Sequence, residues 1–298
     1  MIPHTERRHP LVSIGVPTYN RADLLQLTLD SLLAQTDKNV EIIISDNAST
    51  DGTEALCRAY ADRENRIFYF RQEKNRGQMN NYSFLLQKAR GKYFMWAQDD
   101  DSIDQNYVEV LTDVLEKNPE YSVALSHYYE KRVGALTPLP IRAITHDYTH
   151  KSYRELYERC LYGKISALLL YGLYRTACIK VLYARQLPLT FNNLLLWMSE
   201  LVLAVKVYSV PLLLYTHTQD VRSHEARQPD GPLTLAEKRP FAITHYVATG
   251  PFWLLTSRAI PLHRKLLIFG PWIRRAWKYK RKIFNEWRCA FLNMFRRV

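Results

Sequence analysis

The sequence predicts an α/β fold with a mostly parallel central sheet, helices that flank the sheet, and a basic helical extension at the C-terminus. Three observations carry this prediction. Short apolar, β-branched runs alternate with helix-like segments through about the first 120 residues, a pattern typical of parallel sheets. Each of those runs stops at a polar cluster. The last 31 residues contain nine Lys or Arg and a single acid, Glu286, in a chain whose net charge is +12.

The first half of the chain predicts its elements most clearly. Four apolar runs predict buried strands at residues 11–16, 40–45, 66–70 and 92–97. Apolar spacing and stop signals predict helices at residues 24–33, 54–62, 81–89 and 107–116. Ligands bind beyond the carboxyl ends of parallel strands. The polar strand ends PTYN, SDNASTD, QEKNRG and QDDD therefore predict a binding site along one edge of the sheet.

The second half of the chain is less regular. Strands are expected at residues 123–129 and 210–216, a helix at 193–207, and loops at 134–153 and 219–232. The composition changes after about residue 233. We therefore expect a domain over residues 1–233 and a separate helical, basic, amphipathic region over residues 234–298.

Three consecutive aspartates, Asp99 to Asp101, follow the aromatic and apolar run of the fourth predicted strand. Like charges side by side repel, and a carboxylate near a core is costly unless a positive group pairs with it. Clustered carboxylates at a strand end suit Mn²⁺ or Mg²⁺, which commonly bridge phosphate oxygens. The alternative for an isolated DDD is a solvated turn that caps the next helix.

Four segments in register resemble the family 2 glycosyltransferases with the GT-A fold: PLVSIGVPTYNR, EIIISDNASTDGT, EKNRGQMNN and KYFMWAQDDD. The resemblance is clear over residues 11–115 and looser to about residue 225. It implies a nucleotide-diphospho-sugar transferase, with a nucleotide-sugar half at about residues 10–118 and an acceptor half at about 119–233. It also implies inverting, metal-dependent transfer to a hydroxyl of a glycan or lipid-linked acceptor. The pathway implied is bacterial surface polysaccharide synthesis, of lipopolysaccharide, O-antigen or capsule.

The resemblance also assigns residues to the donor. Asp46 would accept a hydrogen bond from the base or ribose, although a turn or capping role is the alternative. Arg222 would pair with the diphosphate, unless it lies in a solvated loop. The full nucleotide-sugar set comprises Pro17, Thr18, Tyr19, Asn20, Asp46, Asn75, Gly77, Asp99, Asp100 and Arg222.

The metal set implied by the resemblance comprises Asp99, Asp100, Asp101 and His224. We favour Asp100 or Asp101 on the metal and Asp99 on the ribose. Alanine at position 100 or 101 is expected to leave the fold intact, because both residues would lie at a strand end. The family often has an acid two residues before its paired aspartates, and Gln98 stands there in one alignment, so the pairing stays open. For His224, a solvated loop is the alternative.

Glu200, in LLLWMSELVLAV, stands where the family has its catalytic base, and no other acid lies between Glu158 and Asp220. The base accepts the proton of the acceptor hydroxyl as that oxygen attacks the anomeric carbon. The alternative is an exposed helix glutamate, although an idle charge would be unfavourable in such apolar surroundings. Tyr171 and Tyr174 either stack on acceptor sugars or fill the core.

Aromatic and basic residues recur at helical spacing over residues 268–298, as in a helix that lies in a membrane interface. We expect this helix to hold a cytoplasmic enzyme peripherally on the anionic inner face of the cytoplasmic membrane. The alternative is a terminal helix packed on the domain. The polar start predicts no secretory signal, and no run is apolar enough to predict a spanning helix.

Two other function classes compete with sugar transfer. A nucleotidyltransferase on a similar sheet usually needs a glycine-rich, basic phosphate loop near the amino end, and LVSIGVPTYN contains none. A nucleic-acid-binding module would suit the pI of about 9.5 and the 20 tyrosines, but its basic residues should line a groove among aromatics. Here the basic residues gather in the tail, so we expect no nucleic-acid partner.

Overall fold

A computed structural model describes residues 9–133, 140–185, 193–220 and 242–295. The chain divides into two compact units. The first unit comprises Met1–Asp147, Tyr171–Lys180 and Val207–Ser223, and it contains the sheet; the second comprises Tyr148–Leu170, Val181–Lys206 and His224–Val298, and its described core is helical. The boundary expected near residue 233 falls outside the described residues.

The first unit begins with the alternation of strands and helices that the sequence predicts. Its four parallel strands are β1 (Val12–Thr18), β2 (Val40–Asp46), β3 (Ile67–Arg71) and β4 (Tyr93–Trp96). The helices between them are α1 (Ala22–Leu33), α2 (Thr53–Arg63) and α3 (Gln78–Lys88). Every residue of β1, β2 and β4 is buried. Such continuous burial is expected of parallel strands covered on both faces.

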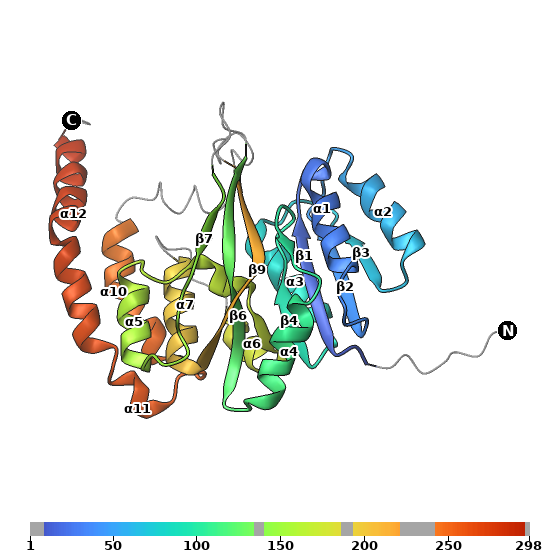
Figure 1. Cartoon of the computed structure of the whole chain (residues 1–298). Coiled ribbons are helices and arrows are strands. Elements are labelled where there is room, and N and C mark those ends of the chain that lie inside the picture. Colours follow the sequence, from blue (N-terminus) through green and yellow to red (C-terminus); the bar gives the residue numbers. More distant parts are fainter. Residues whose placement is uncertain (1–8, 134–139, 186–192, 221–241, 296–298) are drawn as a thin grey trace. The chain divides into compact units, whose positions relative to one another are not determined.

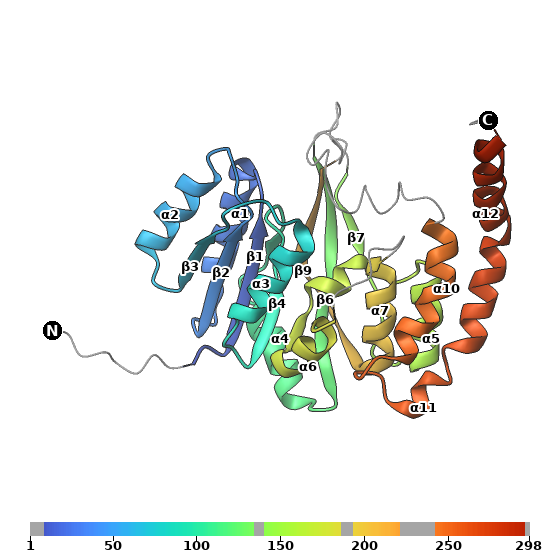
Figure 2. The ribbon, with the colours of Figure 1, turned by 180° about the vertical axis from the view of Figure 1, so that it is seen from behind.

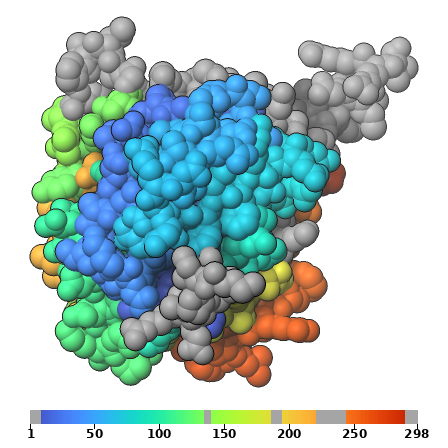
Figure 3. Space-filling view, turned by 90° about the vertical axis from the view of Figure 1, so that its right-hand side faces the viewer, coloured from blue at the N-terminus to red at the C-terminus, as the bar shows by residue number. Residues whose placement is uncertain are grey.

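The helices of this region cover both faces of the sheet. Helices α1 and α2 contact each other, whereas α3 packs on β1 and β2 from the other side (Figure 1 and Figure 2). The connections from β1 to β2 to β3 step one way along the sheet and the connection to β4 steps back, so right-handed crossovers place α3 on the opposite face. The segments from α1 to α3, blue to cyan in Figure 3, form one continuous surface of this unit.

The rest of the sheet is antiparallel. Its strands are β5 (Ser102–Ile103), β6 (Tyr121–Val133), β7 (Arg142–Ile144), β8 (Leu173–Arg175) and β9 (Lys206–Asp220). In the described residues the order is β3-β2-β1-β4-β8-β6-β9-β5, with β7 on β6. Helix α4 (Tyr107–Lys117) lies between β5 and β6 along the chain, and α6 (Thr176–Tyr183) follows β8. The predicted parallel character therefore holds for β1 to β4 only, because β8 pairs antiparallel with β4 and β6, β7 with β6, and β5 with β9.

The second unit is built from helices that pack on one another. They are α5 (Tyr153–Leu161), α7 (Asn193–Ala204), α10 (Ala242–Leu255), α11 (Leu262–Lys265) and α12 (Phe269–Phe295), with a 3-10 turn η1 (Ala167–Tyr171) after α5. Helix α7 contacts α5, α10 and α11, and α12 contacts α10. Over the residues that the structure describes, none of the helices is both long enough and apolar enough to cross a membrane.

Strand register brings the predicted polar ends together at one edge of the first unit. Thr18 at the end of β1 pairs with Asp46 at the end of β2, and Asp46 pairs with Arg71 at the end of β3. Trp96 of β4 pairs with Gly15 of β1, so the acidic loop leaves the sheet at this edge. This confirms that the four strand ends share one edge.

Candidate active site

The acidic loop after β4 is paired with one arginine from the turn after β1. The Arg21 guanidinium lies 3.8 Å from Asp99 Oδ1 and 3.4 Å from Asp100 Oδ2. The side chains of Asp99 and Asp100 are only 14% and 6% exposed. One guanidinium thus faces two mostly buried carboxylates, which leaves the loop short of positive charge.

This shortage of positive charge favours the protonated form of both carboxyl groups, whose pKa values are raised. Burial raises the pKa of Asp99 to about 6, although the positive charge of Arg21 opposes the rise. Burial together with the charges of Asp99 and Asp101 raises the pKa of Asp100 to about 7. Among the described residues, Asp100 Oδ1 is buried and accepts no hydrogen bond. A buried carboxylate oxygen without a partner is costly.

The chemistry of these two carboxylates fits a hard divalent cation. A cation beside Asp100 Oδ1 would supply the partner which that oxygen lacks, and it would offset the repulsion between Asp99 and Asp100. No group of three or more His, Cys, Asp or Glu side chains could hold a metal ion in the described part of the chain.

Asp101 lies in a different environment from its two neighbours. Its carboxylate accepts hydrogen bonds from Tyr215 Oη at 2.6 Å and from the Thr218 backbone N–H at 2.7 Å. His217 Nδ1 lies 3.1 Å from Asp101 Oδ1. Burial lowers the pKa of His217, but its contact with Asp101 outweighs burial and the pKa is raised. The antiparallel pairing of β5 with β9 brings these three residues of β9 to the loop.

The expectation that Asp101 can be replaced without cost to the fold is therefore corrected. Asp101 is buried and joins the acidic loop to β9. We predict that Asp101→Ala destabilises the protein by about 3 kcal/mol or more, because several buried groups lose their acceptor at once. In a thermal melt this corresponds to a fall of roughly 6 °C or more. The exposed Asp104 provides the control, and Asp104→Ala should melt like the parent chain.

The loops after β1 and β2 are bonded to each other. Asn20, at φ 53°, accepts a hydrogen bond from the Thr50 N–H at 2.8 Å, and the Asn20 N–H donates to Ser49 Oγ at 2.9 Å. Asn tolerates this left-handed backbone better than most residues. Thr18 is buried, and Tyr19 is partly exposed beside Asn20. Hydrogen bonds thus hold the predicted first loop in place at the carboxyl edge.

Asp46 is buried, and protein groups hold both of its carboxylate oxygens. Oδ1 accepts from the Ser49 N–H at 2.8 Å, while Oδ2 accepts from Tyr69 Oη at 2.8 Å and from Arg71 at 3.0 Å. Asp46 thereby shapes the loop after β2, as the turn alternative expected. Its contact with a base or ribose stays a prediction.

The loop before α3 is also ordered by its own side chains. Asn75 Oδ1 accepts from Asn47 Nδ2 at 2.7 Å and from the Gly77 N–H at 2.8 Å. Gly77 has φ 82°, a conformation that a side chain would strain. Asn47 therefore ties the β2 loop to the β3 loop, and the two loops form one wall of the edge.

Glu200 of α7 belongs to the second unit, where its carboxylate is fully buried. Trp253 Nε1 donates to Oε2 at 3.2 Å, and Arg185 lies 3.5 Å from Oε1 with its guanidinium 3.7 Å from the centre of the Trp253 ring. Burial raises the pKa of Glu200, although contacts with Ser257, Arg185 and Trp253 oppose the rise. The alternative of an exposed helix glutamate is wrong. The role of Glu200 as a base stays a prediction.

The structure describes two of the four remaining predicted residues. Tyr171 and Tyr174 are buried, and Tyr171 Oη lies 3.2 Å from Tyr82 Oη, so both tyrosines fill the core. Arg222 and His224 lie outside the described residues.

The sequence analysis does not include two residues that the structure places at the aspartates, Arg21 and His217. Arg21 directly follows the PTYN loop, and its position next to that loop was a usable signal. His217 follows the apolar run of β9, seven residues before His224. No local pattern in the sequence linked His217 to the acidic loop, because the pairing of β5 with β9 brings them together.

The comparison with protein families decides the identity at the level of family. The sequence profile described as "Glycosyl transferase family 2" matches residues 13–170, more than half of the chain. The chain belongs to this family. The match includes all the loops of the carboxyl edge, from β1 to Asp101, and Glu200 lies beyond it.

Relatives of this family 2 glycosyltransferase carry the same activity in their names. The uncharacterized glycosyltransferase RT0329 of Rickettsia typhi is 37% identical over 121 residues, which are 41% of this chain and 37% of that protein. The putative teichuronic acid biosynthesis glycosyltransferase TuaG of Bacillus subtilis is 34% identical over 100 residues, which are 34% of this chain and 40% of that protein. The matched segment thus spans well under half the length of these relatives.

A solved structure confirms the predicted fold of the family 2 chain. S. aureus TarS (residues 1–349), in complex with UDP-GlcNAc, matches with a TM-score of 0.67 at 18% identity, over 91% of this chain and 74% of that chain. At this identity the likeness shows the fold, which is GT-A. The predictions of family, fold and glycosyltransferase class are confirmed.

Proposed function

We propose that this family 2 enzyme is a metal-dependent, inverting glycosyltransferase that takes its sugar from a nucleotide diphospho-sugar. The observation that carries this proposal is the pair Asp99 and Asp100. They are mostly buried carboxylates with raised pKa values at the carboxyl edge, and Asp100 Oδ1 lacks a hydrogen-bond partner among the described residues. Such a pair is suited to a cation that the donor diphosphate would share.

Asp99 and Asp100 would hold Mn²⁺ or Mg²⁺, and Asp101 and His217 would position the loop from behind. The bound cation would supply neutralisation of the negative charge that develops on the diphosphate leaving group. Arg21, which already faces the two aspartates, would add a fixed positive charge to the same region. The loops of Asn20, Asp46 and Asn75 would hold the nucleotide.

The proposed transfer is a single displacement at the anomeric carbon. The acceptor hydroxyl oxygen forms a bond to that carbon as the bond to the diphosphate oxygen breaks, and the hydroxyl proton passes to Glu200. Attack from the face opposite the leaving group inverts the configuration. Burial favours this role because it raises the pKa of the Glu200 carboxyl and so strengthens it as a base.

The acceptor is proposed to be a glycan or lipid-linked hydroxyl in the synthesis of bacterial surface polysaccharide. TuaG carries teichuronic acid biosynthesis in its name, and this chain shares its family. We further propose that the enzyme works in the cytoplasm at the inner face of the cytoplasmic membrane. The absence of a nucleic-acid partner stays a prediction.

Nucleotide binding tests this function without knowledge of the acceptor. Thermal melts with UDP, GDP, CDP and dTDP, each with and without Mn²⁺, should show one diphosphate that stabilises the chain. A ligand at 100 times its Kd raises the free energy of unfolding of the protein by about 2.7 kcal/mol. We expect most of this stabilisation to require Mn²⁺. Stabilisation by none of the four, with Mn²⁺ or Mg²⁺, would contradict the proposal. Analysis of the product anomer by NMR then checks inversion.

A further inference from the structure

Helix α12 divides its apolar residues between two stripes. The sequence predicts an amphipathic helix here. In the structure Trp272 and Tyr279, here called the inner stripe, are buried. A second set, here called the outer stripe, is between 56% and 70% exposed. The outer stripe comprises Ile273, Trp277, Phe284 and Trp287. Its members are three, four or seven positions apart, so they lie along one side of the helix.

The inner stripe fixes α12 to α10 within the second unit. Trp272 lies over Gly250, where a Cβ atom would come within 2.2 Å of the indole, and its Nε1 donates to the Val247 carbonyl at 3.1 Å. Glu286 accepts from the backbone N–H groups of Ile243 and Thr244 at 2.9 and 3.0 Å. These contacts hold the inner-stripe side of α12 against α10, while the outer stripe stays exposed.

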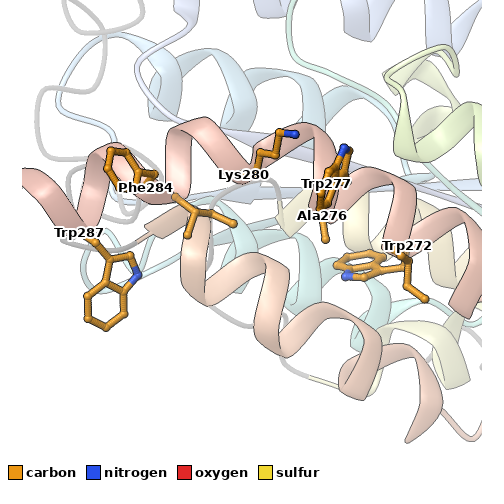
Figure 4. A pocket seen from close by; sticks show the side chains of 8 residues that line it. Trp272, Ala276, Trp277, Lys280, Phe284 and Trp287 are labelled. Atoms are coloured by element: carbon orange, nitrogen blue, oxygen red, sulfur yellow. The ribbon is translucent and has the colours of Figure 1, made fainter.

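The outer stripe borders a shallow apolar groove along α12. The groove has a volume of about 570 Å³, and Figure 4 shows the side chains that line it. Lys280 is the one charged residue in the lining, and its Nζ lies 3.9 Å from the centre of the Trp277 ring. A lysine in that position covers the ring with its aliphatic chain and can turn its ammonium toward a polar surface.

A band of positive charge accompanies the outer stripe. The basic band comprises Lys280, Arg281 and Arg288, all exposed and each three, four or seven positions from a member of the outer stripe. The single acid of the last 31 residues, Glu286, is engaged by the first turn of α10. The surface therefore combines exposed indole and phenyl rings with lysine and arginine, and its own acid is turned toward α10.

We propose that the outer stripe and the basic band dock the enzyme on an anionic lipid bilayer, with α12 lying in the plane of the interface. Aromatic rings would enter the boundary between headgroups and acyl chains, while the basic band would contact anionic headgroups. The inference rests on the proposed function for its biological setting, since a lipid-linked acceptor would be presented at such a surface.

Charge decides between a bilayer and a second copy of the chain. Two copies joined through their outer stripes would bring two basic bands together, and neither band has an acid of its own to pair with the other. An anionic membrane supplies the complementary charge. With 27 residues, α12 is about 40 Å long, enough for several turns to contact the surface.

Sedimentation of the full chain with lipid vesicles tests the proposal. The parent chain should bind vesicles of phosphatidylcholine with 30% phosphatidylglycerol, release at high salt, and bind pure phosphatidylcholine much more weakly. The double variant Trp277→Ser/Phe284→Ser should lose roughly tenfold or more in partition coefficient. The double variant Arg281→Gln/Arg288→Gln should lose roughly fivefold for each residue, and its binding should depend less on salt.

Two controls separate docking from folding and from catalysis. Leu27→Ser/Ile141→Ser removes two apolar side chains of similar exposure, 63% and 59%, in the first unit, and it should bind vesicles like the parent. The docking variants should keep the parent's melting temperature and its response to nucleoside diphosphate. Equal vesicle binding by all variants would overturn the proposal. A soluble dimer of the parent chain that is lost only in the Trp277→Ser/Phe284→Ser variant would also overturn it. If no nucleoside diphosphate stabilises the parent chain, that result would instead contradict the proposed function.

Discussion

Asp100→Asn should abolish sugar transfer and at the same time raise the melting temperature of the metal-free protein. Asparagine keeps the shape of the side chain but removes the negative charge that the cation and the diphosphate would need. It also removes a charge that is costly in the folded state, because burial and the neighbouring aspartates raise the pKa of Asp100 to about 7. We expect turnover to fall by more than roughly a hundredfold.

The stability gain should depend on pH in a defined direction. An acid whose pKa is higher in the folded chain than the usual 3.8 binds its proton more tightly there. The metal-free parent should therefore lose stability as the pH rises from about 4 to about 7. The melting temperature of Asp100→Asn should exceed that of the parent by an amount that grows over this window and levels off above it.

Thermal melts between pH 5 and 8, in chelator and then in Mn²⁺, measure both effects. Mn²⁺ should stabilise the parent and leave the variant nearly unchanged. The control is Asp62→Asn, an exposed residue of α2, which should retain the parent's turnover and metal response. Normal turnover of Asp100→Asn in Mn²⁺ would falsify the assignment of Asp100 to the metal.

Glu200→Gln is expected to lower turnover by roughly a hundredfold or more while donor binding stays nearly unchanged. Glutamine fills the same space and can keep a contact with Trp253, but it cannot accept the acceptor's proton. A modest fall in melting temperature should accompany the change, because the buried ion pair with Arg185 is lost. Normal turnover combined with a large loss of stability would assign Glu200 a structural role.

A second variant reports on the proton itself. In the parent, turnover should decline as the pH falls through the pKa of Glu200, because only the carboxylate is a base. Trp253→Phe removes the indole N–H that opposes the rise of this pKa, so the decline should begin at a higher pH. Glu200→Gln should show no such decline in its residual activity. A decline at the same pH in all three chains would assign it to another group.

The parallel half of the fold was predictable because each of its strands has a recognisable apolar pattern in the local sequence. Strands β1, β2 and β4 are buried over their full length, so their sequences are continuous apolar runs. Strands β7 and β8 have three residues each, too few to show any period. Strand β7 therefore lies within residues 134–153, which the sequence predicts as a loop, and it forms by pairing with β6.

The acidic site was predictable in place but not in detail. Asp99 and Asp100 lie where the strand pattern put them, at the carboxyl edge. The partner of Glu200 was not predictable, because Trp253 lies 53 positions further along the chain. Asp101 was misjudged for a similar reason, since its hydrogen-bond donors come from β9, and no local pattern links a loop to a strand so distant.

That distance has a consequence for how the chain folds. Asp101 and the Thr218 N–H that it accepts from are 117 positions apart. A ribosome adding about 5–20 residues per second takes roughly 6 to 23 seconds to cover that stretch. During this time β1 to β4 can pair, but the acidic loop lacks the strand that secures it. Contacts of such long sequence separation also form slowly, so the order of synthesis makes this loop one of the last parts of the first unit to be secured.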